Sequence, residues 1–185
     1  MPADAKSLRI HPAVEAIARD TARGDDGIDF TLIELLFFAY RDFTSDPDQI
    51  LARYGFGRAH HRVLHFVNRM PGLTIAELLD VLKITKQSLA RVLKQLIDAG
   101  YVEQVQGPKD RRQRELYPTA KGRALALALA MPQSHRIREA LEAAGPGDRR
   151  VIETFLKSMV NPDQRGQIDR LPGTTTGTGD GEHGS

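Results

Sequence analysis

The stretch from Leu73 to Gly122 constrains the fold of this chain more than any other. Thr74 and Glu77 have the spacing of a capping box, in which a hydroxyl accepts from the N–H three residues on and the carboxylate reaches back to the cap. Leu73 and Leu78 stand at the two positions of a hydrophobic staple. A short helix is therefore expected to begin after Thr74. Its apolar residues at helical spacing are Ile75, Leu78, Leu79 and Leu82.

A second helix is expected after a tight turn at Lys83 and Ile84. Thr85 can cap this helix, and Gly100 can end it because glycine tolerates the left-handed backbone of a helix end. One face is apolar and predicted to be buried: Leu89, Val92, Leu93, Leu96 and Ile97. The other face combines small residues, donors and cations. With the cap, its members are Thr85, Lys86, Gln87, Ser88, Ala90, Arg91 and Lys94.

This polar face has the composition of a helix that reads a DNA major groove. Long cations meet phosphates or guanine edges there, amides meet adenine, and small residues permit close approach. We expect Lys86 and Lys94 mostly to contact phosphate, and Gln87, Ala90 and Arg91 to reach base edges or adjacent backbone. For this helix alone, an ordinary solvated face is the favoured interpretation.

The residues that follow favour the first interpretation. Tyr101–Val105 and Gln113–Tyr117 are short strand candidates, joined through a Gly107-Pro108 turn. The turn and the start of the second strand are strongly charged: Lys109, Asp110, Arg111, Arg112 and Arg114. Helix, turn, helix and basic hairpin together predict a winged helix-turn-helix. The expected fold class is mainly α with a small β-hairpin wing.

This segment resembles the MarR family of bacterial transcriptional regulators over about fifty residues. The matching features are the Pro71–Thr74 start, the AELLDVLKI stretch before the turn, and Ser88 with Arg91 in the second helix. The wing residues Asp110, Arg111 and Arg112 and the sequence Thr119-Ala120-Lys121-Gly122 complete the match.

The resemblance implies a homodimer that binds a pseudo-palindromic operator in double-stranded DNA and is often released by a small molecule. It also implies that Arg112 enters the minor groove and that Asp110 holds the wing by an ion pair. The chemistry agrees, because a narrow minor groove attracts arginine and a nearby carboxylate can orient a guanidinium. Asp110 as a plain turn residue is the alternative.

Charge is distributed unevenly along the chain, although the formal net charge is only +2. Residues 1–50 hold five Lys or Arg and ten Asp or Glu, a net of −5. Residues 83–123 hold ten and four, a net of +6, which is the electrostatic pattern of a nucleic-acid binder. The chain has no cysteine, so disulfides, thiolate nucleophiles and cysteine-zinc sites are excluded. No cofactor is expected.

Five regions are predicted along the chain. Residues 1–27 form an N-terminal arm, in which Pro12–Arg23 could be helical, and residues 28–57 form a dimerisation helix and its connection. Residues 58–122 form the DNA-binding domain. Residues 123–162 form C-terminal dimerisation helices, which we expect to pair with Ile28–Phe43 of a partner chain. Residues 163–185 form a disordered tail, Gly- and Thr-rich from Leu171 onward.

The segment Ile28–Phe43 is apolar nearly all round. Such a helix must be covered on nearly all sides, which favours a subunit interface; a buried central helix of a monomer is the alternative. We expect a break or irregularity at Asp46-Pro47 and a further helical turn over Gln49–Tyr54.

The next helix, Arg58–Met70, carries His60, His61 and His65. His61 and His65 are four residues apart, the spacing of a two-histidine metal site, but no acidic residue lies nearby in sequence and surface or interface histidines are the alternative. By resemblance, a small-molecule pocket would lie beside the dimer helices. Its candidate lining residues are Phe38, Arg41, His61 and His65.

After the wing, Thr119 can cap another helix, which Pro132 is expected to interrupt or kink. Helical character resumes over Ser134–Ala144. Asp148 is expected to cap a last helix that ends at Asn161-Pro162.

The sequence thus predicts a dimeric DNA-binding regulator. A winged-helix module that binds protein is the alternative, disfavoured by the cationic face because interface cores are depleted in charge. An enzyme is disfavoured because no phosphate loop, HExxH motif or convincing carboxylate pair is present. No signal peptide or membrane-length apolar run is seen, so the cytoplasm is the expected compartment.

Overall fold

The computed structural model describes residues 27–107, 113–145 and 147–172. The chain divides into two compact units, Met1–Tyr40 and Arg41–Ser185. The expected helix Pro12–Arg23 and the end of the expected tail lie outside the described residues.

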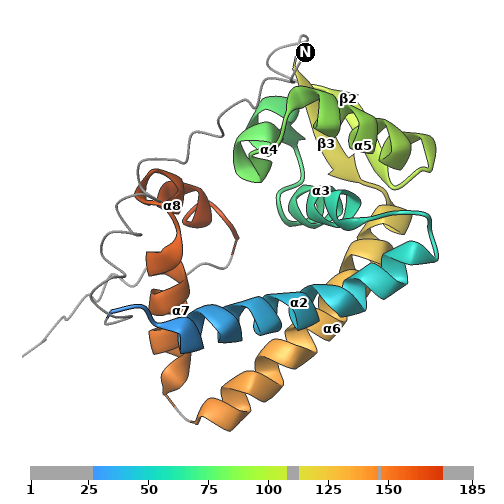
Figure 1. Cartoon of the computed structure of the whole chain (residues 1–185). Coiled ribbons are helices and arrows are strands. Elements are labelled where there is room, and N and C mark those ends of the chain that lie inside the picture. The colour runs from blue at the N-terminus through green and yellow to red at the C-terminus, as the bar shows by residue number, and fades with distance from the viewer. Residues whose placement is uncertain (1–26, 108–112, 146, 173–185) are drawn as a thin grey trace, which may run out of the picture. The chain divides into compact units, whose positions relative to one another are not determined.

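The first unit contributes the start of helix α2 (Phe30–Ala52) (Figure 1). Asp29 begins the helix, because its Oδ1 accepts from the backbone N–H of Leu32 at 2.9 Å. Apolar side chains of this unit are 42–70 % exposed: Ile28, Phe30, Leu32, Ile33, Leu35, Leu36, Phe37, Phe38 and Tyr40. The apolar surface of the described part of this unit is thus largely open to solvent.

Helix α2 runs without a break through Pro47, so the break expected at Asp46-Pro47 is wrong. Proline at this position removes the N–H that would bond to the carbonyl of Phe43. That carbonyl instead accepts from the side-chain amide of Gln133, with the two atoms 3.3 Å apart. A partner ninety residues away thus compensates for the missing helical bond.

The second unit contains the helix-turn-helix and its wing (Figure 1). Its helices are α3 (Arg58–Arg69), α4 (Ile75–Leu82), α5 (Lys86–Asp98), α6 (Ala120–Ala144), α7 (Asp148–Met159) and α8 (Pro162–Ile168). Its strands are β1 (Leu73–Thr74), β2 (Val102–Gln106) and β3 (Arg114–Pro118). The described residues form a mostly helical fold with a small sheet, as the sequence predicts.

The sheet is antiparallel and has the order β1-β3-β2. Val102 pairs with Pro118 and Gln106 with Arg114, so the two wing strands start one residue later than expected. The sequence pattern does not predict strand β1. Leu73 of β1 pairs with Leu116 of the wing strand β3. This pairing joins the start of the helix-turn-helix to the wing.

The core lies among α3, α4, α5, the sheet and the first half of α6. Its residues come from the apolar positions expected from helical spacing, including Leu78, Leu82, Leu89 and Leu96. Leu51 at the end of α2 and Leu129 of α6 are also fully buried. Burial of apolar side chains is therefore the main interaction that holds α5 in place.

Further expectations about the C-terminal part are corrected. Helix α6 continues through Pro132, which does not interrupt it, so Ala120–Ala144 is a single helix of 25 residues. Helix α8 begins at Pro162 and extends into the stretch expected to be a disordered tail. Proline suits a first helical position because the N–H it lacks would have no partner there. Gly147, not Asp148, is the capping residue of α7. In the described part of the chain, no helix is long and apolar enough to span a bilayer.

Candidate nucleic-acid interface

The turn between α4 and α5 sets the direction of the second helix. Lys83 adopts the left-handed conformation, with φ 49° and ψ 47°. Arg62 of α3 donates to the carbonyl of Leu82 at 2.7 Å, which satisfies one of the free carbonyls at the end of α4. The turn is thus held by a charged side chain from a neighbouring helix.

The first turn of α5 is closed by the expected cap. The Thr85 hydroxyl accepts from the backbone N–H of Ser88 at 3.2 Å and donates to the Ser88 hydroxyl at 2.9 Å. Both residues are among those predicted to lie at the interface, and both are exposed. Their first role is structural, because they fix the end of the helix that would enter a groove.

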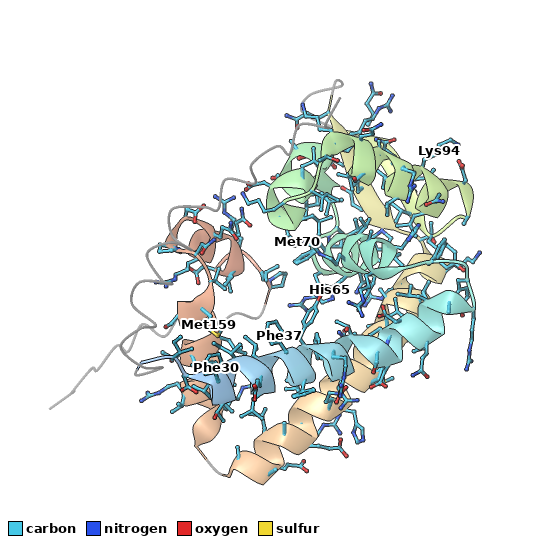
Figure 2. All side chains as sticks on the ribbon, in the orientation of Figure 1. Phe30, Phe37, His65, Met70, Lys94 and Met159 are labelled. Atoms are coloured by element: carbon cyan, nitrogen blue, oxygen red, sulfur yellow. The ribbon has the colours of Figure 1, made fainter. Side chains whose placement is uncertain are left out.

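The remaining predicted interface residues of α5 are exposed, while its opposite face is buried. The exposed residues are Lys86, Gln87, Ala90, Arg91 and Lys94. The Lys94 ammonium, which projects from the helix in Figure 2, lies 2.6 Å from a carboxylate oxygen of Asp98. Both side chains are well exposed, so this ion pair contributes little to stability. Lys94 can therefore leave Asp98 and pair with another anion.

A groove of about 520 Å³ separates the start of α4, the outer face of α5 and the base of the wing. Lys86 and Ala90 of α5 line it together with Gln113 and Arg114 of the wing. The structure therefore brings Arg114 beside α5. The other predicted wing residues, Lys109, Asp110, Arg111 and Arg112, lie outside the described residues.

The apolar wall of this groove, which Ile75, Ala76 and Leu79 of α4 provide, is not predicted by the sequence pattern. Ile75 and Leu79 belong to the predicted core stripe, but they are only partly buried. The sequence feature that indicates this wall is Ala76, a small exposed residue of α4.

The base of the wing is built on short polar contacts. Gly107 donates its N–H to the carbonyl of Gln113 at 3.0 Å, next to the end of the ladder. The Tyr117 hydroxyl donates to a carboxylate oxygen of Glu115 at 2.8 Å. This hydrogen bond raises the pKa of the Tyr117 phenol. The bond keeps the tyrosine ring against Gly72, where an added Cβ would lie 3.1 Å from the hydroxyl oxygen.

The end of α5 is joined to the start of α6. The Thr119 hydroxyl donates to the carbonyl of Gly100 at 2.7 Å and accepts from the N–H of Gly122 at 3.0 Å. Lys121 donates to the carbonyl of Ala99 at 3.0 Å, and its ammonium lies 4.2 Å from the centre of the Tyr101 ring. The expected cap at Thr119 is thus also a link between two helices.

A second cavity, of about 410 Å³, lies within the Arg41–Ser185 unit. Residues of α2 and α6 form most of its wall, of which four are apolar, and three basic side chains also line it. Its lining includes Phe43, His65, Ala130, Gln133, Ser134, Ile137, Arg138, Leu141 and Arg149.

Of the candidate pocket residues, the structure places only His65 among those that line this cavity. His61 is half-buried beside it, with the two ring centroids 6.5 Å apart. Arg41 forms an ion pair with Asp42 at 2.8 Å, and Phe38 is exposed on the part of α2 that belongs to the first unit. Phe43, about half a helical turn beyond Arg41, lines the cavity instead.

Burial sets the ionisation of the two histidines. Desolvation lowers the pKa of His61. It also lowers the pKa of His65, and the nearby His61 and Arg69 lower it further. Among the described residues, no group of three or more His, Cys, Asp or Glu side chains could hold a metal ion.

A capped helix-turn-helix, a wing hairpin within a three-stranded sheet and an exposed cationic face on α5 define a winged helix-turn-helix protein. The MarR family model matches residues 54–113. The chain is 50 % identical over 139 residues to the HTH-type transcriptional regulator PetP of Rhodobacter capsulatus, an alignment that covers 75 % of this chain and 84 % of that protein. The chain belongs to the MarR family.

Solved structures show the same fold. A MarR protein from Peptoclostridium difficile is 22 % identical, with a TM-score of 0.60 over 72 % of this chain and 88 % of that one. A MarR transcriptional regulator from Methanosarcina mazei is 25 % identical, with a TM-score of 0.57 over 75 % and 98 %.

Proposed function

We propose that this protein is a homodimeric transcriptional regulator that binds a pseudo-palindromic operator in double-stranded DNA and responds to a small molecule. The observation that carries the proposal is the exposed face of α5, where Lys86, Gln87 and Arg91 lie on a helix capped and held at both ends. A related regulator at 50 % identity supports it.

In the proposed complex, each α5 enters a major groove and each wing reaches the flanking minor groove. Arg91 and Gln87 contact base edges, while Lys86, Lys94 and Arg114 contact phosphates. Arg112 enters the minor groove, with Asp110 orienting its guanidinium. Two half-sites lie about one helical turn, roughly 34 Å, apart.

The test begins with selection of bound duplexes from a random library by the purified protein. A palindromic site with the predicted spacing is expected. Binding to that site should fall by about 1–3 kcal/mol in the Arg91→Ala variant, as for loss of one good base contact. Arg53→Ala, which removes an exposed cation from the loop after α2, should change binding by less than about 0.5 kcal/mol. Failure to enrich any duplex would contradict the proposal.

Salt dependence provides a second measurement. If six to ten phosphates are neutralised, affinity should fall by about 10³–10⁵ between 50 and 200 mM salt. A winged-helix module that binds protein would show no such slope with duplex DNA.

We propose that a second copy of the chain buries the exposed apolar faces of α2 and α7. In the second unit, Val151, Phe155 and Met159 form a stripe along α7 and are 66 %, 49 % and 52 % exposed. In the first unit, the apolar side chains of α2 are similarly open. Sedimentation should give a dimer for the wild-type protein. Phe155→Glu should shift it toward monomer, whereas Thr154→Glu, off the stripe, should not.

The cavity lined by His65 is the proposed effector site. The cavity combines apolar side chains with two cations, Arg138 and Arg149, so it suits an amphipathic ligand. A thermal-shift screen with small organic compounds should yield ligands that weaken operator binding. Ile137→Trp, which fills the cavity, should abolish the ligand response and leave DNA binding intact. Ligands that act equally on this variant would remove the assignment of the cavity.

A further inference from the structure

His60 joins helix α3 to the recognition helix α5. Its Nε2 lies 2.9 Å from Oε1 of Gln95, a residue 35 positions further along the chain. Its Nδ1 accepts from the backbone N–H of Gly57 at 3.1 Å. An acceptor at Nδ1 means that the neutral ring carries its hydrogen on Nε2, so His60 donates to Gln95. The bond is directional, unlike apolar packing, and its Gln95 end lies on the exposed side of α5.

The His60 ring is itself held in place. It is 9 % exposed and stacks on Phe56, with centroids 4.7 Å apart and planes 18° apart. Phe56 in turn packs edge-on against Tyr101, with centroids 5.3 Å apart. Tyr101 is buried where α5 meets α6. The Nε2 donor of His60 is therefore held in a fixed position by the packing of its ring. A side chain needs such a fixed position if it is to orient another helix.

Gln95 is placed to act on the interface. It lies four residues after Arg91, one turn further along the same side of α5. The buried side of α5, including Leu89, Val92 and Leu96, packs by apolar contact, which is non-directional. A hydrogen bond at Gln95 adds a directional restraint on rotation of the helix about its own axis. That rotation decides whether Gln87 and Arg91 meet base edges.

We propose that His60 is a positioning residue whose hydrogen bond to Gln95 sets the rotation of α5, and with it the base selectivity of the protein. This inference rests on the proposed DNA-binding function. Base contacts require close geometry, whereas flexible lysines reach phosphates from many orientations. Loss of the bond should therefore lower discrimination between sequences more than it lowers binding to DNA in general.

The test uses the full-length protein and two duplexes of equal length, the operator selected by the wild-type protein and a random sequence, at one salt concentration. The measured quantity is the ratio of the two dissociation constants. His60→Asn keeps an acceptor where Nδ1 lies and removes the donor at Nε2. Gln95→Met keeps the side-chain length and removes the acceptor. Each should lower the ratio roughly 3- to 10-fold, the range for one hydrogen bond.

Three comparisons separate positioning from stability. The double variant should lose no more selectivity than either single variant, because all three lack the same bond. His60→Gln, whose amide nitrogen can take the place of Nε2, should restore most of the ratio. Gln104→Met, the same change at an exposed site on β2, should leave it unchanged. A variant that only unfolds in part loses affinity for both duplexes equally, and its ratio stays constant.

The outcomes are distinct for the two proposals. If the wild-type protein selects an operator but His60→Asn and Gln95→Met keep its ratio, or if their effects add in the double variant, the positioning role is wrong. If the wild-type protein shows no preference between the duplexes, the proposed function fails and the inference fails with it.

Discussion

Gly122 lies so close to Tyr101 that a Cβ built on the glycine would stand 1.8 Å from the Tyr101 carbonyl oxygen. The same oxygen accepts from the N–H of Thr119 at 3.1 Å, so it cannot move away without breaking that bond. The first turn of α6 therefore packs directly against the backbone that follows α5. Only a residue without a side chain permits this approach.

Replacing Gly122 with alanine should destabilise the fold by about 3 kcal/mol or more, at or above the upper end of ordinary overpacking, because the clash is with backbone. Urea denaturation measures the loss. Gly166→Ala in α8 is the matched control, since nothing lies within 4 Å of its Cβ position. Alanine favours a helix more than glycine does, so a similar loss in both variants would show that the contact with Tyr101 is not responsible.

The capping box of α4 should make stability depend on acid pH. Hydrogen bonds from the Thr74 hydroxyl and N–H lower the pKa of Glu77 below its ordinary value of 4.5. The stabilisation is therefore complete above that value and is lost as pH falls through the lowered pKa of the folded state. Glu77→Gln keeps a capping side chain that does not titrate. Urea unfolding at pH 7 and pH 3 should show a smaller acid loss for this variant than for the wild type.

At neutral pH, Thr74→Ala should cost about 1 kcal/mol, the usual value of a lost cap. The loss should shrink at pH 3, where the wild-type box is already weakened. An undiminished loss at pH 3 would contradict the role assigned to Glu77.

His61 and His65 should make the fold less stable in mildly acidic solution. Because burial lowers both pKa values from 6.5, the unfolded chain takes up protons before the folded one does. Their contribution is complete above about pH 6.5 and is lost as pH falls through the lowered values. The melting temperature should fall between pH 7.5 and pH 5, and less steeply in a His61→Gln, His65→Gln variant. Ring-proton NMR titration with midpoints at or above 6.5 would overturn this assignment.

Lys83 is the non-glycine residue with positive φ in the described chain, and substitutions there should rank by backbone preference. The left-handed conformation costs about 1–2 kcal/mol for a residue with a side chain. Lys83→Gly relieves this cost, but it makes the unfolded chain more flexible and removes an exposed ion pair with Asp80. Because these effects offset one another, its free energy of unfolding should stay within about 1 kcal/mol of the wild-type value. Lys83→Val should be less stable than Lys83→Gly by about 1–2 kcal/mol. Equal melting temperatures for the two variants would argue against a strained turn.

Several features predicted correctly from the sequence have partners within one helical turn. The caps at Thr74, Thr85 and Thr119 each use a donor three residues away, so local pattern is sufficient to predict them. The exposed face of α5 follows from its apolar stripe in the same way.

The features that local pattern misses depend on distant partners. Pro47 stays in a helix because Gln133 satisfies the carbonyl left free by proline. Local sequence suggests a surface or interface position for His60, whereas its partner Gln95 lies 35 residues away. Neither neighbour is visible from local spacing, and both follow from how the helices pack.

The pairing of Leu73 with Leu116 has a consequence for how the domain folds. It encloses α4, α5 and the wing in a loop of more than forty residues, whose closure costs roughly 3 kcal/mol of chain entropy before the contact forms. The two strands that close it cannot form as a local hairpin, so β1 should join the sheet late, after α5 and the wing have collapsed. The enclosed segment should then gain protection from hydrogen exchange as one cooperative unit, and a fragment that ends before β3 should not reach the native state.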